Sequence, residues 1–433
     1  MKRAAVGKKI SGVARASLSI TAGVGAGQLI LIAISPVLTR LFTPQEFGHY
    51  TILISVIAVM SVAATLRFEA AIPLAMTAED ALGVARAGVA STLFFSFLVI
   101  PILIAVELVI PWKLLPDGGG AQLWVLVPAV IAFGLYELGT QFAIRRQRYG
   151  AVGARSLIQS GGTALGQLSF GVLGVGSGLI WGQILGKLLA VGFLAPLVRT
   201  ESRDLGRVPK LREIFKKYKR FPLFLAPSSL FNVLGTQAPY LMIGAVFGAP
   251  AIGFLGLIQR LVAAPQALVG QAIGQVYVGE AAARLRGGAG DSRRPFVRAT
   301  SWLVIIALPI GVGMALIPGS LLGAIFGTEW EGASAYLSAF APAFVAQFVV
   351  APVSQTLIIA GRQRLQLMWD VSRVIIVSSA IIAVHAYGGS AVDATWAFSI
   401  ASVMCYGALW FLCLAAASRP VADSSEDERP RQN

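Results

Sequence analysis

Long apolar runs alternate with short polar gaps along the whole chain, and the positive charges are concentrated in every second gap. About 30 of the 35 Lys and Arg residues lie in these alternate gaps, whereas only Arg40 and Lys113 lie in the others. Loops that stay on the cytoplasmic side of a membrane retain Lys and Arg, because positively charged flanks resist translocation. The pattern therefore predicts a polytopic membrane protein, and it predicts the number and orientation of the spans together.

The composition points to the same class. Hydrophobic residues make up 56% of the chain, charged residues 13%, and the mean hydropathy is +0.75. Because one membrane-crossing helix needs about 20 apolar residues, the 433 residues leave room for about twelve crossings and short loops. We therefore expect an all-α polytopic membrane protein. The net charge of +15 is explained by insertion topology and anionic headgroups, and no nucleic-acid partner is expected.

The apolar runs predict twelve spans. Both termini and the basic gaps then lie on the cytoplasmic side, and the first run is expected to remain as a span because it lacks a clean signal-peptide cleavage site. The predicted spans are 17–38, 49–66, 87–110, 121–141, 151–174, 178–198, 221–246, 251–275, 297–317, 333–358, 365–387 and 393–415.

Two sequence echoes indicate that the chain consists of two related halves. Phe42 and Gly48, after the first span, have the same spacing as Phe247 and Gly253, after the seventh. The corners before the fifth and eleventh spans contain Arg-Gln-Arg at 146–148 and 362–364. Both echoes recur six spans later on the same side, as a parallel duplication requires. The domains predicted from this are a six-helix bundle at 1–198, a basic cytoplasmic linker at 199–220, a second six-helix bundle at 221–415 related to the first by a pseudo-twofold axis, and a disordered cytoplasmic tail at 416–433.

Three cations lie deep inside predicted spans: Lys187, Arg260 and Arg373. Lys187 and Arg260 are each about ten residues into a span, so at 1.5 Å per residue they lie roughly 15 Å deep. A charge at that depth usually faces a partner or a water-filled cavity. For Arg373, Asp370 one turn away is an equally good explanation, whereas Lys187 and Arg260 have no acidic neighbour in sequence, and we expect them to line a cavity. Gln183 and Gln259 beside them fit a polar lumen.

No cofactor or metal site is predicted. The segment Gly182 to Lys187 is one residue too short for a phosphate-binding loop and lacks the Ser or Thr that should follow it. Cys405 and Cys413 are too far apart on one helix to form a disulfide. No paired-carboxylate motif for glycosyl transfer is present. A membrane-embedded enzyme is therefore only the second class of function that we consider, after a transporter.

Several stretches, spread over nearly the whole chain, carry a family resemblance. They are Thr39 to Gly48, Leu66 to Pro73, Tyr218 to Pro222 with Asn232, Gln259-Arg260 to Gln275, Phe326 to Trp330, and Pro352 to Thr356 followed by Gly361 to Arg364. The chain resembles the lipid-linked oligosaccharide flippases, the O-antigen or exopolysaccharide translocases of the MOP (multidrug, oligosaccharidyl-lipid and polysaccharide) exporter superfamily. The resemblance implies a MATE-like fold in the bacterial cytoplasmic (inner) membrane.

The resemblance also implies a substrate, an oligosaccharide on undecaprenyl diphosphate that moves from the cytoplasmic to the outer leaflet. We expect Arg260 and Lys187 to attract the diphosphate, with secondary contacts near the two mouths of the cavity. Arg40, Arg67 and Arg373 are the candidates for these contacts, and Gln183, Gln259 and Asn232 for contacts to sugar hydroxyls. The expected partners are membrane lipids, a polysaccharide polymerase and a chain-length regulator, and a coupling proton or sodium ion is left open. A cation-coupled multidrug exporter of the same superfamily is the alternative transporter, although its cavity should be acidic.

Overall fold

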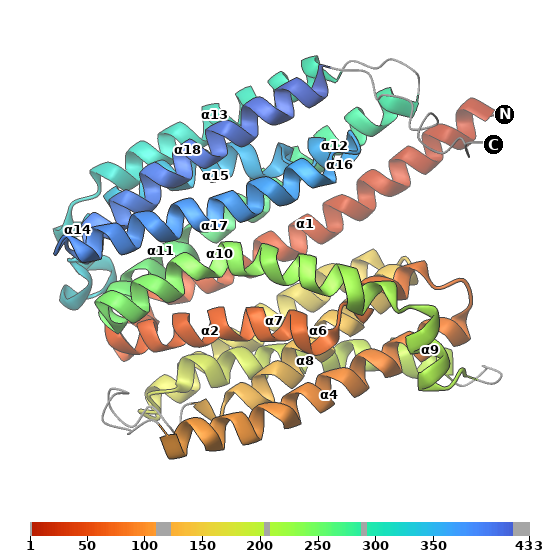
Figure 1. Ribbon diagram of the computed structural model, residues 1–433, viewed down its shortest axis with the longest axis horizontal. Helices are drawn as coiled ribbons and strands as arrows, with labels where there is room; N and C mark the ends of the chain where they lie inside the picture. Colours follow the sequence, from red (N-terminus) through yellow and green to blue (C-terminus); the bar gives the residue numbers. More distant parts are fainter. Residues whose placement is uncertain (1, 110–122, 203–207, 287–291, 419–433) are drawn as a thin grey trace, which may run out of the picture.

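In the part of the chain that the computed structural model describes, residues 2–109, 123–202, 208–286 and 292–418, all regular structure is helical. Figure 1 shows two groups of long helices, one from each half of the chain, with α1 running between them. The prediction of an all-α protein with two six-helix bundles is confirmed. Most of the predicted tail, which we placed at 416–433, lies outside the described residues.

Most helices of the first half pack on one another, with α7 between α1 and α8, and α6 between α4 and α8, whereas α2 packs mainly on α11 and α10 of the second half. They are α1 (Lys2–Leu41), α2 (Pro44–Thr65), the short α3 (Phe68–Ala71), α4 (Ala78–Val109), α6 (Leu126–Arg145), α7 (Tyr149–Val172) and α8 (Gly178–Ser202).

In the second half, α15 packs on α13 and α18, and α17 packs on α10 and α18. The long helices are α10 (Ala226–Phe247), α11 (Ala249–Pro265), α12 (Gln271–Arg286), α13 (Arg293–Leu316), α15 (Ala333–Val350), α17 (Gln363–Ala386) and α18 (Ala391–Ala417), and the short ones are α9 (Leu211–Lys217) in the linker, α14 (Gly319–Phe326) and α16 (Thr356–Ile359).

Eleven helical segments of the described residues are long and apolar enough to cross a membrane. The predicted fifth span, 151–174, is not among them, although it coincides with the 24-residue helix α7. This helix is rich in Gly and Ser and carries Arg155, so its mean hydropathy is low. It is nevertheless sandwiched between α1 and α8, where polar and small residues are covered by protein. We therefore count α7 as the twelfth span.

The bundles meet in a close contact, here called the gate, where α2 crosses α11. A Cβ atom on Gly48 would lie 1.9 Å from the carbonyl oxygen of Ala249, and one on Gly253 would lie 1.8 Å from that of Pro44. Since 249 − 44 and 253 − 48 both equal 205, each helix makes the same contact to the other, as a pseudo-twofold axis requires. The first sequence echo thus marks residues that pack on one another.

The second echo marks two equivalent turns, but aligning the repeated Arg-Gln-Arg sequences does not superpose equivalent residues of these turns. Gln147 and Gly361 both have a left-handed backbone, with φ of 56° and 72°. Each ends a helix in the same hydrogen-bond pattern, in which Arg148 N–H donates to Ala143 and Arg362 N–H donates to Leu357. Arg148 therefore corresponds to Arg362, an offset of 214 residues (362 − 148) instead of the 216 given by the repeated Arg-Gln-Arg.

Most basic corners lie at the end of the molecule opposite the gate, here called the basic end, where Figure 1 also shows α9 and the start of α1. Helix α9 docks on the first bundle through buried Ile214 and the ring of Phe215, 4.9 Å from that of Phe68. Lys217 donates a hydrogen bond to Asp80 of α4, and this bond raises the pKa of Lys217. Protein thus covers Ile214 of the linker helix, while Leu211, Phe215 and the basic side chains stay exposed.

Candidate functional site

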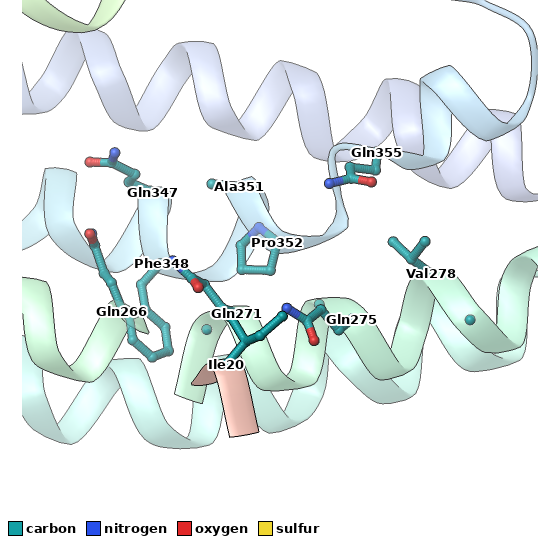
Figure 2. Close-up of a pocket in the computed structure, with 13 residues that line it drawn as sticks. Ile20, Gln266, Gln271, Gln275, Val278, Gln347, Phe348, Ala351, Pro352 and Gln355 are labelled. Carbon is teal, nitrogen blue, oxygen red and sulfur yellow. The ribbon is translucent and has the colours of Figure 1, made fainter. Parts of the chain in front are cut away.

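A cavity of about 690 Å³ lies between α1 and the second bundle, farther toward the basic end than the gate (Figure 1). Its polar lining consists of amide side chains, and Ile20 of α1 is the contribution of the first bundle. Figure 2 shows these side chains gathered around one space. The glutamines are Gln266, Gln271 and Gln275 from the α11–α12 segment, and Gln347 and Gln355 from the α15–α16 segment.

Two interruptions of regular α-helix geometry direct these glutamines toward the cavity. After Pro265, residues 266–270 form a π-helical turn between α11 and α12, a feature that often marks functional sites because it re-aims side chains. On the facing segment, a 3-10 turn containing Pro352 interrupts the path from α15 to α16. Gly274 lets the two segments approach, since a Cβ there would lie 2.9 Å from the Cβ of Pro352. Figure 2 shows Pro352 between the two segments.

A second cavity, of about 260 Å³, lies inside the second bundle and shares Gln266 and Gln347 with the first. It contains the predicted residues Arg373 and Gln259. Arg373 donates from Nη1 to the hydroxyl of Tyr406 at 2.9 Å. The expected pairing with Asp370 is loose, with Nη2 4.0 Å from Oδ1. The guanidinium also stacks over the ring of Trp369, with its central carbon 4.8 Å from the centroid.

Arg260, which we expected to line an open lumen, lines neither of these two cavities. Its Nε donates to the carbonyl of Leu31 on α1 at 3.2 Å, and its Nη2 donates to Oε1 of Gln167 on α7 at 2.8 Å. Gln167 is fully buried and is itself fixed by donating to the carbonyl of Leu179. Arg260 therefore bridges the two bundles in this conformation.

Lys187 is also absent from both cavity linings and lies within the first bundle. Its ammonium is 4.1 Å and 3.8 Å from the ring centroids of Phe133 and Tyr136, a double cation–π contact. Glu137 attracts it electrostatically and Arg155 repels it. The predicted pair, Arg260 and Lys187, is thus not brought together around one space, and the role of each as a diphosphate contact stays a prediction.

The remaining predicted residues are dispersed. Arg40 donates to the carbonyl of Ala324 on α14 at 3.2 Å, near the gate. Arg67 pairs with Glu69 at 3.1 Å, at the basic end. Asn232 is exposed on α10 and Gln183 is partly buried on α8, and neither lines the two cavities.

Sequence reasoning missed the glutamine cluster and Arg155. Glutamines recur in the apolar spans at 266, 271, 275 and 347, and that recurrence was the available signal. Arg155 lies only one turn inside its predicted span, where a basic side chain would ordinarily reach the headgroups. Instead it is buried, donating to Thr140 and stacking 4.2 Å above the centroid of the Tyr136 ring.

Comparison with known proteins identifies the family. Residues 37–335 match the family described as polysaccharide biosynthesis protein. The teichuronic acid biosynthesis protein TuaB of Bacillus subtilis (strain 168) is 25% identical over 189 residues, 44% of this chain and 39% of that relative. The match thus spans about two fifths of the relative's length.

Solved structures show the fold. An inward-facing multidrug resistance MATE family transporter of the MOP superfamily superposes with a TM-score of 0.72 at 15% identity, covering 93% of this chain and 98% of that one. The lipid II flippase MurJ in an inward closed conformation gives 0.70 at 10% identity, covering 92% and 89%. An outward-facing MATE transporter gives 0.57 at 13% identity, covering 93% and 96%. The resemblance drawn from the sequence is confirmed: the chain belongs to the polysaccharide biosynthesis protein family and has the fold of the MOP superfamily transporters.

Proposed function

We propose that this protein is a flippase that carries an undecaprenyl-diphosphate-linked oligosaccharide from the cytoplasmic to the outer leaflet of the bacterial inner membrane and leaves the lipid chemically unchanged. The observation that carries the proposal is the glutamine-lined cavity between α1 and the second bundle. Amide groups both donate and accept hydrogen bonds, so they match sugar hydroxyls without imposing a charge.

The conformation fits loading from the cytoplasm. The bundles are packed together at the gate, and the cavity lies toward the basic end, which the charge pattern assigns to the cytoplasm. The higher similarity to the inward-facing than to the outward-facing transporter agrees with this assignment. Rocking of the bundles about the gate would then expose the cavity to the opposite side.

The cations keep a role in this proposal. A diphosphate crossing a low-dielectric interior needs compensating charge. Opening the gate would break the contact of Arg260 with Leu31 and release its guanidinium into the space between the bundles. The multidrug alternative is disfavoured, because the linings of the two polar cavities contain no Asp or Glu among the described residues.

Replacing the paired glutamines tests the proposal. Gln271 and Gln275 lie one turn apart on α12 and both line the cavity. Since each lost hydrogen bond costs about 1 kcal/mol, or roughly fivefold, the variant with Gln271→Leu and Gln275→Leu should translocate lipid-linked oligosaccharide at least tenfold more slowly. Gln363→Leu, an exposed change at the start of α17, is the matched control and should keep the wild-type rate. Undiminished translocation by the double variant would refute a sugar-binding role for this cavity.

A further inference from the structure

The smaller cavity within the second bundle holds a buried cation whose hydrogen-bonding capacity the protein does not use up. Arg373 is 8% exposed. Its Nε and Nη2 have no hydrogen-bond partner in the protein. A buried guanidinium normally has its donors satisfied, because each unpaired donor carries a desolvation cost. The two unused donors therefore favour an acceptor from outside the protein.

The surrounding elements hold Arg373 in place without using its Nε and Nη2 donors. Tyr406 accepts one hydrogen bond and Trp369 supports the flat face of the guanidinium. Asp370 stays 4.0 Å from Nη2, beyond hydrogen-bonding distance. On the other side, Nη2 lies against Gly235, where a Cβ would be 2.9 Å away. A side chain at this position would collide with the free donor.

The other polar groups of the cavity are uncharged. Gln237, Gln259, Gln266, Gln347 and Ser402 line it, and Arg373 carries the one formal charge of the described lining. A diphosphate bears more negative charge than one cation offset by a nearby carboxylate can balance. The lining instead matches a ligand with one negative charge and several hydroxyls. The volume of about 260 Å³ equals that of about nine water molecules, enough for a single sugar ring.

We propose that this cavity binds one acidic sugar of the transported glycan, with Arg373 donating hydrogen bonds to the carboxylate of that sugar and the amides bonding to its hydroxyls. Bidentate pairing of a guanidinium with a carboxylate is strong and directional. Gln266 and Gln347 line both cavities, so the ring enters from the larger one while the rest of the oligosaccharide stays there. The role in transport rests on the proposed flippase function, but the binding step does not.

Binding of soluble sugars to the full-length, detergent-solubilised protein tests the inference without a lipid carrier. Methyl glucuronoside should raise the thermal unfolding midpoint in a saturable way, because a ligand of the folded state stabilises it. Methyl glucoside, which differs by lacking the carboxylate, should need at least tenfold more ligand for the same shift. Equal shifts from the two glycosides would overturn the proposal, and so would an equal shift from sodium acetate, which would identify a site for small anions only.

Substitutions test whether the glucuronoside binds at Arg373. Arg373→Gln should abolish the shift with glucuronoside, whereas Arg364→Gln, which removes an exposed charge from the same helix, should leave it intact. If Arg373→Gln does not fold, Gln237→Leu keeps the cation and should weaken binding about fivefold, the cost of one hydrogen bond. Full binding by Arg373→Gln or Gln237→Leu contradicts the assignment. Because no leaflet transfer is measured, failure of this test is distinct from failure of the flippase proposal.

Discussion

At the scale of single residues, the position of a cation along its predicted span indicated that its side chain would lie within the protein. It did not indicate which of these cations lie close together. Lys187 and Arg373 are buried, Arg260 is partly buried, and protein atoms engage all three. Pairing was expected as one explanation for Arg373, whereas Lys187 and Arg260 were expected to line a cavity. The sequence offers no direct signal of which helices face one another, so it did not reveal that Lys187 points among aromatic rings while Arg260 crosses between bundles. The contact between Asp370 and Arg373 was predictable because it joins residues one helical turn apart.

The bridge formed by Arg260 makes a prediction about coupling between bundles. Arg260→Ala and Gln167→Leu should each lower stability by about 1.5–3 kcal/mol, the usual range for a hydrogen bond to a charged group. Because they remove the same contact, the double variant should cost little more than the larger single one. Thermal or denaturant unfolding in detergent measures this. Strict additivity would show that the two side chains act independently, and Arg260→Lys should lose less than Arg260→Ala.

At the scale of helices, hydropathy predicted nearly every long helix. The predicted ends mark where the apolar run stops, and the observed helices begin or end elsewhere. The span predicted to end at 275 continues as α12 to Arg286, since a helix does not stop where the hydrocarbon layer does. Conversely, the helix α2 begins at Pro44, before the predicted 49, because Thr43 and Glu46 form a capping box at its start. The π-helical turn after Pro265 left no recognisable mark in the periodicity, so the convergence of the glutamines was not predictable.

The crossing of α2 and α11 yields a prediction about the gate. Gly253→Ala would bring a methyl group to 1.8 Å from the carbonyl oxygen of Pro44, so the two backbones must separate. We expect a loss of about 1–3 kcal/mol, typical of overpacking, together with a shift away from the closed gate. Crosslinking between cysteines introduced on α2 and α11 would report the separation.

Gly161→Ala on α7 is the matched control, because a Cβ there meets nothing within 4 Å. It should leave crosslinking unchanged. Wild-type crosslinking in Gly253→Ala would contradict the close approach of the two helices.

At the scale of the whole molecule, the basic gaps, the duplication and the cavity are consistent with one arrangement of two related bundles. The alternating charge predicts that the basic end faces the cytoplasm. The reciprocal contact at an offset of 205 residues places the pseudo-twofold axis at the gate, and the glutamine cavity lies between the gate and the basic end. The division into two halves was predictable because duplication leaves matching letters. The conformation was not, since the two states of an alternating-access protein share one sequence.

The most direct test of the proposed function is transfer between leaflets in proteoliposomes that contain the purified wild-type protein and a lipid-linked oligosaccharide placed in one leaflet. Access of a membrane-impermeant glycosidase reports the leaflet, and mass spectrometry reports the chemistry. The proposal predicts time-dependent movement of the oligosaccharide to the opposite leaflet, absent from protein-free liposomes, with the mass of the lipid unchanged. Movement no faster than in protein-free liposomes, or a new covalent product, would contradict it.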